Sequence, residues 1–348
     1  MSLYVDIEKQ FSTFKLKVKF ESRNEVLGLL GQSGSGKSIT LKCISGLITP
    51  DRGKIILNDK VLFDSDKKIN LSPQMRKTGY LFQNYALFPT MKIKDNIKIG
   101  LNDMNNHEKD ALMNNYIEKF GLSGLENRYP WQLSGGQMQR AALARALITS
   151  PDILLLDEPF SALDMHLRKT MEKELLSIIK DFNKDVIFVT HDIGEAYRIC
   201  DEIIVYNNGI SQDKRNKHDL FNAPRTLSEA RLTGCRNISK AVRTSDNSII
   251  AEDFGYEYYF NHKIPDNINY LCIRSHDIQI ASVTDCPNVH QYIITNIIEN
   301  PFDYTLYICK EADSSHRPIE LIIKKDNFAY KSGHKIYLNF PEDKMFYF

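Results

Sequence analysis

A glycine-rich run near the N-terminus constrains the fold of this chain more than any other feature. It follows a short apolar run over residues 26–30 and precedes a helical pattern over residues 39–47. Glycines allow the backbone to wrap so that successive N–H groups face an anion, and the helix presents its positive end to the same point. The pattern predicts a strand, a phosphate-binding loop and a helix. The loop consists of Gly31, Gln32, Ser33, Gly34, Ser35, Gly36, Lys37 and Ser38.

Two residues at the end of this loop indicate its chemistry. Lys37 would place a positive charge beside the β- and γ-phosphates, and the Ser38 hydroxyl is typical of a Mg²⁺ ligand. A chance glycine-rich turn is the alternative, but it requires the flanking strand and helix to be coincidental as well. We therefore expect a bound nucleotide with Mg²⁺.

A second apolar run, over residues 153–156, ends in Asp157 and Glu158. A buried strand of this kind would place both carboxylates at its tip, facing the loop. Asp157 is predicted to hold Mg²⁺, and Glu158 to take a proton from the attacking water. Taken alone, an apolar run that ends in two acids is common and indicates a core strand.

The run Leu133-Ser134-Gly135-Gly136-Gln137 opens another helical pattern, over residues 137–148. Ser134 and the amides of Gly135 and Gly136 would lie where the helix dipole begins, which makes a second phosphate cradle. The alternative is a simple helix cap. Since one nucleotide needs one cradle, two per chain are consistent with two chains that face each other head-to-tail, each ATP lying between the loop of one and this run of the other.

The length of 348 residues and a change in residue pattern along the chain predict two domains. Apolar strands alternate with helical patterns through residue 233, which predicts an α/β domain with a largely parallel sheet over residues 1–233. Short β-branched and aromatic runs separated by turn residues follow, which predicts a small all-β domain, an OB-like barrel, over residues 234–348.

Composition argues against several classes of partner and site. The net charge of +1 gives no reason to expect a nucleic-acid partner. The six cysteines are scattered without a C-x-x-C pair, which favours reduced thiols over zinc or disulfides. Neither a signal peptide nor a run of ~18 apolar residues is present, so we expect any membrane attachment to come through a partner protein.

Together the motifs at residues 31–38, 83, 133–137, 153–158 and 191 resemble, in kind and order, the ATP-binding subunits of ABC transporters. The resemblance covers about two thirds of the chain. It implies a P-loop ATPase domain that hydrolyses ATP with Mg²⁺, forms a homodimer in the ATP-bound state and drives transmembrane permease subunits.

The resemblance also implies roles for single residues. Gln83 would reach the metal and couple it to the permease, and His191 would contact the γ-phosphate. Asp164, in the run 161–164, would bridge the two subunits. Phe11 is a candidate for stacking on adenine, although Phe14 is close and either could belong to the core.

Three further stretches narrow the resemblance to importers. Residues 84–96 resemble the segment that docks a membrane helix, with Leu87, Phe88 and Pro89 as its apolar part; local core packing is the alternative. Residues 57–83 and 232–237 resemble molybdate-import ATPases. The expected function is therefore ATP-driven import of an oxyanion, molybdate or tungstate, at the cytoplasmic face of the cell membrane, with a substrate-binding protein as an indirect partner. A sulfate, polyamine or iron importer is the alternative, and a non-transport ABC ATPase is a remote one.

One departure concerns the second domain. Molybdate-binding barrels usually carry a Ser-Ala-Arg-Asn-like run whose backbone amides wrap the oxyanion. Residues 285–289 contain only a fragment of such a run. This leaves open whether the domain binds an oxyanion and regulates the ATPase, or only stabilises the dimer.

Overall fold

The computed structural model of the chain describes residues 2–101, 104–281, 286–311, 317–325 and 330–348. The chain forms two compact units, Met1–Lys217 and His218–Phe348. The sequence placed the boundary after residue 233. The helix before that position, α8 (Leu227–Leu232), belongs to the second unit because its Ala230 packs against Cys235 and Cys272.

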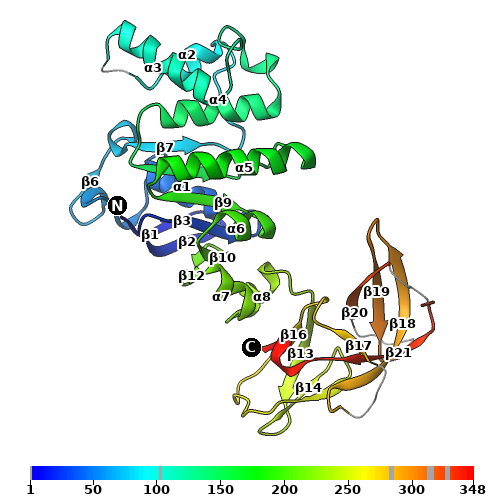
Figure 1. The fold of residues 1–348 in the computed structure, drawn as a ribbon. Helices are drawn as coiled ribbons and strands as arrows, with labels where there is room; N and C mark the ends of the chain where they lie inside the picture. Colours follow the sequence, from blue (N-terminus) through cyan, green and yellow to red (C-terminus); the bar gives the residue numbers. More distant parts are fainter. Residues whose placement is uncertain (1, 102–103, 282–285, 312–316, 326–329) are drawn as a thin grey trace. The chain divides into compact units, whose positions relative to one another are not determined.

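The elements of the first unit are β1 (Leu3–Gln10), β2 (Lys15–Ser22), β3 (Val26–Gly31), α1 (Lys37–Ser45), β4 (Arg52–Leu57), β5 (Lys60–Asp64), β6 (Ile69–Asn70), the 3₁₀ turn η1 (Pro73–Arg76), β7 (Thr78–Leu81), α2 (Ile93–Lys98), α3 (Asn106–Lys119), η2 (Pro130–Gln132), α4 (Gly135–Leu147), β8 (Ile153–Asp157), α5 (Met165–Phe182), β9 (Val186–Thr190), α6 (Ile193–Ile199), β10 (Glu202–Asn207), β11 (Ile210–Ser211) and β12 (Arg215–Asn216). Helices separate the strands from β7 to β10 of this unit, as the sequence predicts, whereas three consecutive strands precede α1 and three more follow it (Figure 1).

One mixed sheet runs through this unit. Parallel pairing joins β10, β3, β9, β8 and β7 in that order. β8 and β9 are buried along their whole length, as strands covered on both faces must be. An antiparallel wing of β2, β1, β4, β5 and β6 extends the sheet. The predicted α/β domain with a largely parallel core is confirmed.

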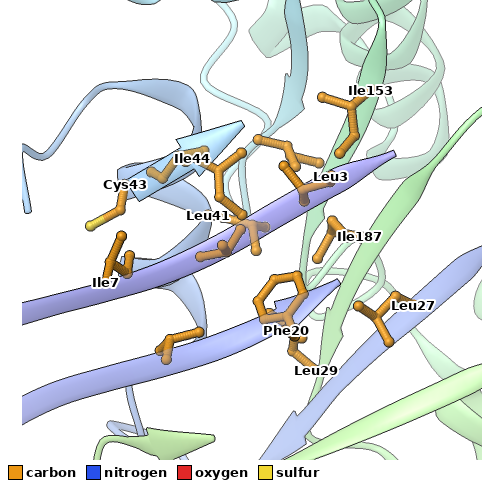
Figure 2. Packing of buried hydrophobic residues seen from close by; sticks show 14 of the residues in the cluster. Leu3, Ile7, Phe20, Leu27, Leu29, Leu41, Cys43, Ile44, Ile153 and Ile187 are labelled. Carbon is orange, nitrogen blue, oxygen red and sulfur yellow. The ribbon is translucent and has the colours of Figure 1, made fainter. Parts of the chain in front are cut away.

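The apolar core fixes the strand and the helix that flank the phosphate loop (Figure 2). Leu27 and Leu29 of β3 belong to the same buried cluster as Leu41 and Ile44 of α1 and Ile187 of β9. Burying each such side chain contributes about 1.5–3 kcal/mol. The loop between β3 and α1 is therefore anchored at both ends.

Three helices form a separate layer: α2, α3 and α4 pack against one another, and α4 packs against β7. Figure 1 shows this group, in cyan to green, on the far side of β7 from β3. The helix predicted at residues 137–148 starts slightly earlier, at Gly135, and α3 starts at Asn106. Their first turns are fixed by capping boxes, in which Asn105 pairs with Glu108 and Ser134 with Gln137.

The second unit consists of two five-stranded sheets that share one core. Their orders are β15-β14-β13-β16-β22 and β17-β21-β18-β19-β20. The all-β prediction is confirmed, and the strands that we expected to close as a barrel form two sheets. The elements are α7 (Lys217–Asn222), α8, β13 (Asn237–Arg243), β14 (Ser248–Ala251), β15 (Tyr256–Tyr259), β16 (Tyr270–Ile273), β17 (Gln279–Ala281), β18 (Val289–Glu299), β19 (Asp303–Cys309), β20 (Ile319–Lys324), β21 (Lys335–Asn339), η3 (Glu342–Lys344) and β22 (Met345–Tyr347).

A side chain joins the two sheets of the second unit. The Asn237 amide donates to the Glu320 carbonyl at 2.9 Å and accepts from the Glu320 N–H at 2.7 Å. It thereby replaces a ladder pair between β13 and β20. Within the residues that the structure describes, none of the helices combines the length and the apolar composition that a membrane span requires.

Candidate functional site

The phosphate loop has the backbone shape that its glycines predict. Gly34 and Gly36 have φ angles of 79° and 103°, which lie in the left-handed region that favours glycine. A Cβ atom on Gly36 would lie 2.5 Å from Leu16 Cδ1, so a larger residue would also collide with the core. Gly36 caps α1, and the open N–H groups of the first helical turn therefore face the concave side of the loop.

Lys37 lies inside this loop. Its ammonium group donates hydrogen bonds to the carbonyls of Gly31 at 2.8 Å and Gln32 at 2.9 Å, and the residue is only 4% exposed. Burial lowers the pKa of Lys37, and the carboxylates of Glu158 and Asp157 act in the opposite direction. The Ser35 hydroxyl is a third neutral acceptor, at 3.5 Å. A buried ammonium group whose hydrogen-bond partners are all neutral gains further stabilisation from an anion, which suits this position to a phosphate.

Ser38 and Asp157 meet at the other side of the loop. The Ser38 hydroxyl donates to Asp157 Oδ1 at 2.6 Å, and the Tyr80 hydroxyl donates to Asp157 Oδ2 at 3.0 Å. Burial is the main reason why the pKa of Asp157 is raised. A hydroxyl and a buried carboxylate in contact are hard oxygen donors, and these residues fit Mg²⁺.

Glu158 continues the chain directly after β8 in a strained conformation. Its φ of 45° lies in the left-handed region, and its N–H donates to the Val189 carbonyl at 3.0 Å. Its Oε2 atom receives the Gln83 amide at 3.3 Å and lies 3.1 Å from His191 Nδ1. Glu158, Gln83 and His191, the three residues predicted to be catalytic, therefore meet at one carboxylate oxygen of Glu158.

The run from Ser134 to Gln137 forms the N-terminus of α4, and part of its composition has a structural cause. The Gln137 N–H donates to Ser134 Oγ at 3.4 Å, and the Ser134 N–H donates to Gln137 Oε1 at 3.0 Å. Cβ atoms on Gly135 and Gly136 would lie 3.1 Å from Leu163 and 3.3 Å from Leu167. The glycines therefore let α4 approach α5 closely.

The structure does not bring this run to the phosphate loop of the same chain. α4 packs with α2, α3 and β7, whereas α1 packs with β3, β8 and β9. Among the described residues, no hydrogen bond or ion pair connects Ser134, Gly135, Gly136 or Gln137 with residues 31–38. Two separate helix starts are thus present.

The loop between β8 and α5 lies between these two parts. Asp164 caps α5 by accepting the Leu167 N–H at 2.9 Å. Ser161 Oγ donates to the Glu158 carbonyl at 3.0 Å, and Leu163 approaches Gly135. This loop therefore connects the Glu158 backbone to the start of α4.

Phe11 is stacked on Phe14, with ring centroids 5.0 Å apart and planes 5° apart. Both rings pack in part against the core cluster. Phe14 is the closer of the two to the loop, since a Cβ atom on Gly36 would lie 3.7 Å from its ring. The geometry of this pair is consistent with both alternatives from the sequence, stacking on adenine and packing in the core.

Three contacts at the site were missed by sequence reasoning. Tyr80 binds Asp157, as described above. Arg145 of α4 donates to the carbonyls of Tyr85 and Ala86 at 2.7 Å each, and its guanidinium lies 5.7 Å from the Phe88 ring centroid. Asn96 holds Phe88 by both its N–H and its carbonyl. The only sequence signal was that Tyr80 lies in the short strand β7 and that Arg145 interrupts an apolar run over residues 141–147 of α4.

The fragment at residues 285–289 has a structural role where the structure describes it; Asp285 lies outside the described residues. The buried Asn288 amide accepts from the Tyr259 N–H at 2.8 Å and donates to the Tyr259 carbonyl at 2.9 Å. Both ends of this amide are therefore engaged with β15.

Comparison with known proteins agrees with this geometry. A family profile described as ABC transporter matches residues 15–161. The chain is 32% identical over 286 residues to a molybdenum import ATP-binding protein of Haemophilus influenzae, covering 80% of each chain. It is 33% identical over 362 residues to a sulfate/thiosulfate import ATP-binding protein of Mannheimia succiniciproducens, covering 97% of this chain and 96% of the other.

Among solved structures, a dimeric ATP-binding cassette in a post-hydrolysis state, bound to ADP and Pi, matches with a TM-score of 0.53 and 27% identity. The match covers 62% of this chain and 99% of that one. The ordered motifs, the α/β unit and these relatives lead to one conclusion. The chain belongs to the ABC transporter family, as an ATP-hydrolysing, ATP-binding subunit of an importer in the group of molybdate, sulfate and polyamine import subunits.

Proposed function

We propose that this subunit drives the import of an oxyanion, molybdate or tungstate. The ATP-driven part rests on one observation: Ser38, Asp157 and Glu158 meet beside the loop that holds Lys37. The choice of cargo is supported by residues 57–83 and 232–237 and by the molybdenum-import relative. The domain that the sequence assigns to residues 234–348 acts as an accessory domain.

The residues of the site divide the chemistry of hydrolysis. The amides of residues 31–36 and the Lys37 ammonium bind the β- and γ-phosphates, and Ser38, Asp157 and Gln83 would hold Mg²⁺. When bound, Mg²⁺ neutralises charge that develops on the phosphate oxygens. Glu158 accepts the proton of the attacking water. His191 and Gln83 orient its carboxylate, and His191 is also positioned to reach the γ-phosphate.

A homodimer completes the nucleotide site. The isolated chain holds two helix starts that could each bind phosphate, at Gly36 and at Ser134, on different packing layers. Two copies arranged head-to-tail would place the Ser134 end of one against the phosphates bound by the other, with Asp164 beside the contact. The dimeric state of the solved cassette supports this arrangement.

Residues 84–96 form the contact with permease subunits, and through them the protein associates with the cytoplasmic face of the membrane. Phe88 and Pro89 are exposed, while Leu87 is half-buried. Arg145 and Asn96 hold the backbone of this segment from within. An exposed apolar segment on a fixed backbone suits docking of a partner helix.

ATPase activity of the subunit assembled with its permease and substrate-binding protein tests the cargo. The expected result is stimulation by molybdate and tungstate and none by sulfate. Stimulation by sulfate or by a polyamine would retain the importer and replace the cargo. The alternatives of a sulfate, polyamine or iron importer are thereby compared directly, since the sulfate/thiosulfate relative covers nearly the whole chain. Activity that needs no permease would instead favour the non-transport alternative.

A further inference from the structure

Trp131 is the one tryptophan of the chain, and it is 72% exposed. It lies on η2, directly before α4. Burying an aromatic side chain removes 150–250 Å² of surface from water, which is worth several kcal/mol at about 25 cal/mol per Å². A tryptophan left in solvent beside a functional helix start therefore indicates a ligand or partner.

The backbone around this tryptophan is held in place. The Tyr129 N–H donates to Gln132 Oε1 at 2.8 Å, and the Leu133 N–H donates to the Pro130 carbonyl at 3.1 Å. The rings of Tyr129 and Trp131 are nearly parallel, with centroids 6.2 Å apart and planes 8° apart. The indole is thus presented from an ordered turn and has solvent over most of its surface.

The distance to Ser134 suggests what the indole binds. Trp131 and Ser134 are three positions apart in the sequence, so their Cα atoms lie at most about 11 Å apart. In the proposed dimer the Ser134 end receives the γ-phosphate of the nucleotide held by the other copy. A nucleotide anchored there carries its base at the opposite end of the triphosphate, within reach of a neighbouring large side chain.

We infer that Trp131 stacks on the adenine of the ATP bound by the second copy of the chain. The stacked pair of Phe11 and Phe14 beside the loop would offer the other face of the base, so the two copies would enclose it from both sides. Stacking of a base on an aromatic ring contributes about 1–3 kcal/mol. This inference rests on the proposed head-to-tail dimer and adds a base-binding residue to it.

Because the chain has a single tryptophan, its fluorescence reports this contact directly. The full chain carrying Glu158→Gln is titrated with Mg²⁺ and ATP at several protein concentrations, and dimer formation is followed in parallel by sedimentation. We expect Trp131 fluorescence to change with the dimer fraction. Ribose 5-triphosphate lacks the base. If it also induces a dimer, Trp131 fluorescence should not change in that dimer.

Variants distinguish stacking of Trp131 on the base from a general apolar contact. Trp131→Ala should raise the ATP concentration for half-maximal dimerisation about tenfold to hundredfold, and Trp131→Phe should restore most of the loss. Met165→Ala is the matched control, because Met165 is 81% exposed at the start of α5 and should leave the titration unchanged.

Each other outcome overturns the inference in a distinguishable way. An ATP-dependent dimer with unchanged fluorescence, or with equal changes for ATP and ribose 5-triphosphate, would retain the dimer and remove the base contact. A fluorescence change at protein concentrations where only monomer is present would place the base on the same chain. Absence of any ATP-dependent dimer would refute the proposed arrangement itself.

Discussion

His191 and Glu158 lie 3.1 Å apart, between the imidazole Nδ1 and the carboxylate Oε2, at the ends of two adjacent parallel strands. The Gln83 amide reaches the same oxygen at 3.3 Å. Two side chains that contact one carboxylate oxygen restrict the orientation of the carboxylate, which is the requirement for a base that must face a single water molecule. The strained backbone of Glu158 adds to this constraint.

Replacing Glu158 by Gln should slow ATP turnover by roughly 10²–10⁴-fold, the usual contribution of a general base. The substitution keeps the shape of the side chain and its contacts with Gln83 and His191, so ATP binding should be unchanged. Single-turnover hydrolysis and nucleotide titration measure the two properties separately. Hydrolysis at the normal rate would remove Glu158 from the role of base.

A double-mutant cycle tests whether His191 acts through Glu158. We expect His191→Ala to slow hydrolysis in the parent chain and to have a much smaller effect when Glu158 is already Gln, because groups that act as one unit are not additive. The measured quantity is the single-turnover rate of all four proteins. Fully additive effects would show that His191 serves the γ-phosphate independently of Glu158.

Replacing Ser134 by Ala should reduce hydrolysis through the dimer and leave nucleotide binding by the monomer intact. Among the described residues, Ser134 has no hydrogen bond or ion pair with the loop of its own chain, and in the proposed dimer the second copy brings it to the phosphates. The loss of its helix cap would also cost about 1 kcal/mol of stability. Asn105→Ala, which removes the corresponding cap of α3, is a control for that structural effect. Equal loss of monomer binding by Ser134→Ala would contradict the trans arrangement.

Much of the first unit could be predicted because its signals are local in sequence. The loop at residues 31–38 depends on neighbouring glycines, and β8 was predicted close to its observed bounds from the apolar run over residues 153–156. Contacts between distant residues carry no such signal. Arg145 binds the carbonyl of Ala86, 59 residues away, and Tyr80 binds Asp157, 77 residues away.

For the same reason, the sequence predicts the strands of the second unit but not how they assemble. Its strands follow alternating patterns, whereas the way they assemble depends on Asn237, whose partner Glu320 is 83 residues away. The division into units also differs from the predicted boundary, because α8 has a helical pattern of its own and its side chains pack with later strands.

Replacing Arg145 by Ala should uncouple hydrolysis from the permease more than it slows the isolated subunit. The guanidinium links α4 to Tyr85 and Ala86, both of which have positive φ angles, of 61° and 44°. Two partly buried carbonyls would lose their donor, at a cost of up to about 1–3 kcal/mol each. Arg145→Lys retains charge but lacks the fork that binds both carbonyls. We therefore expect it to show an intermediate loss of permease-stimulated activity, with basal activity close to normal. Equal losses of basal and stimulated activity would assign Arg145 a purely structural role.

Replacing Asp157 by Asn should abolish the Mg²⁺ dependence of the site and, at neutral pH, stabilise the fold. Burial is the largest cause that raises the pKa of Asp157 above its ordinary value of 3.8. A raised folded-state pKa means that the native state binds the proton more tightly, so the ionised carboxylate destabilises the fold once the pH rises through that pKa.

Thermal unfolding without nucleotide, between about pH 4 and pH 8, measures this difference. Asp157→Asn should unfold at a higher temperature than the parent at neutral pH, and the gain should shrink as the pH falls through the raised pKa of Asp157 towards its ordinary value of 3.8, below which the carboxyl is mostly protonated in both states. Added Mg²⁺ should raise the unfolding temperature of the parent and leave the variant unchanged. Asp152→Asn, just before the start of the same strand, is the matched control because that side chain is more exposed, at 35%. A variant less stable than the parent at neutral pH would show that the hydrogen bonds from Ser38 and Tyr80 outweigh the cost of burying the charge.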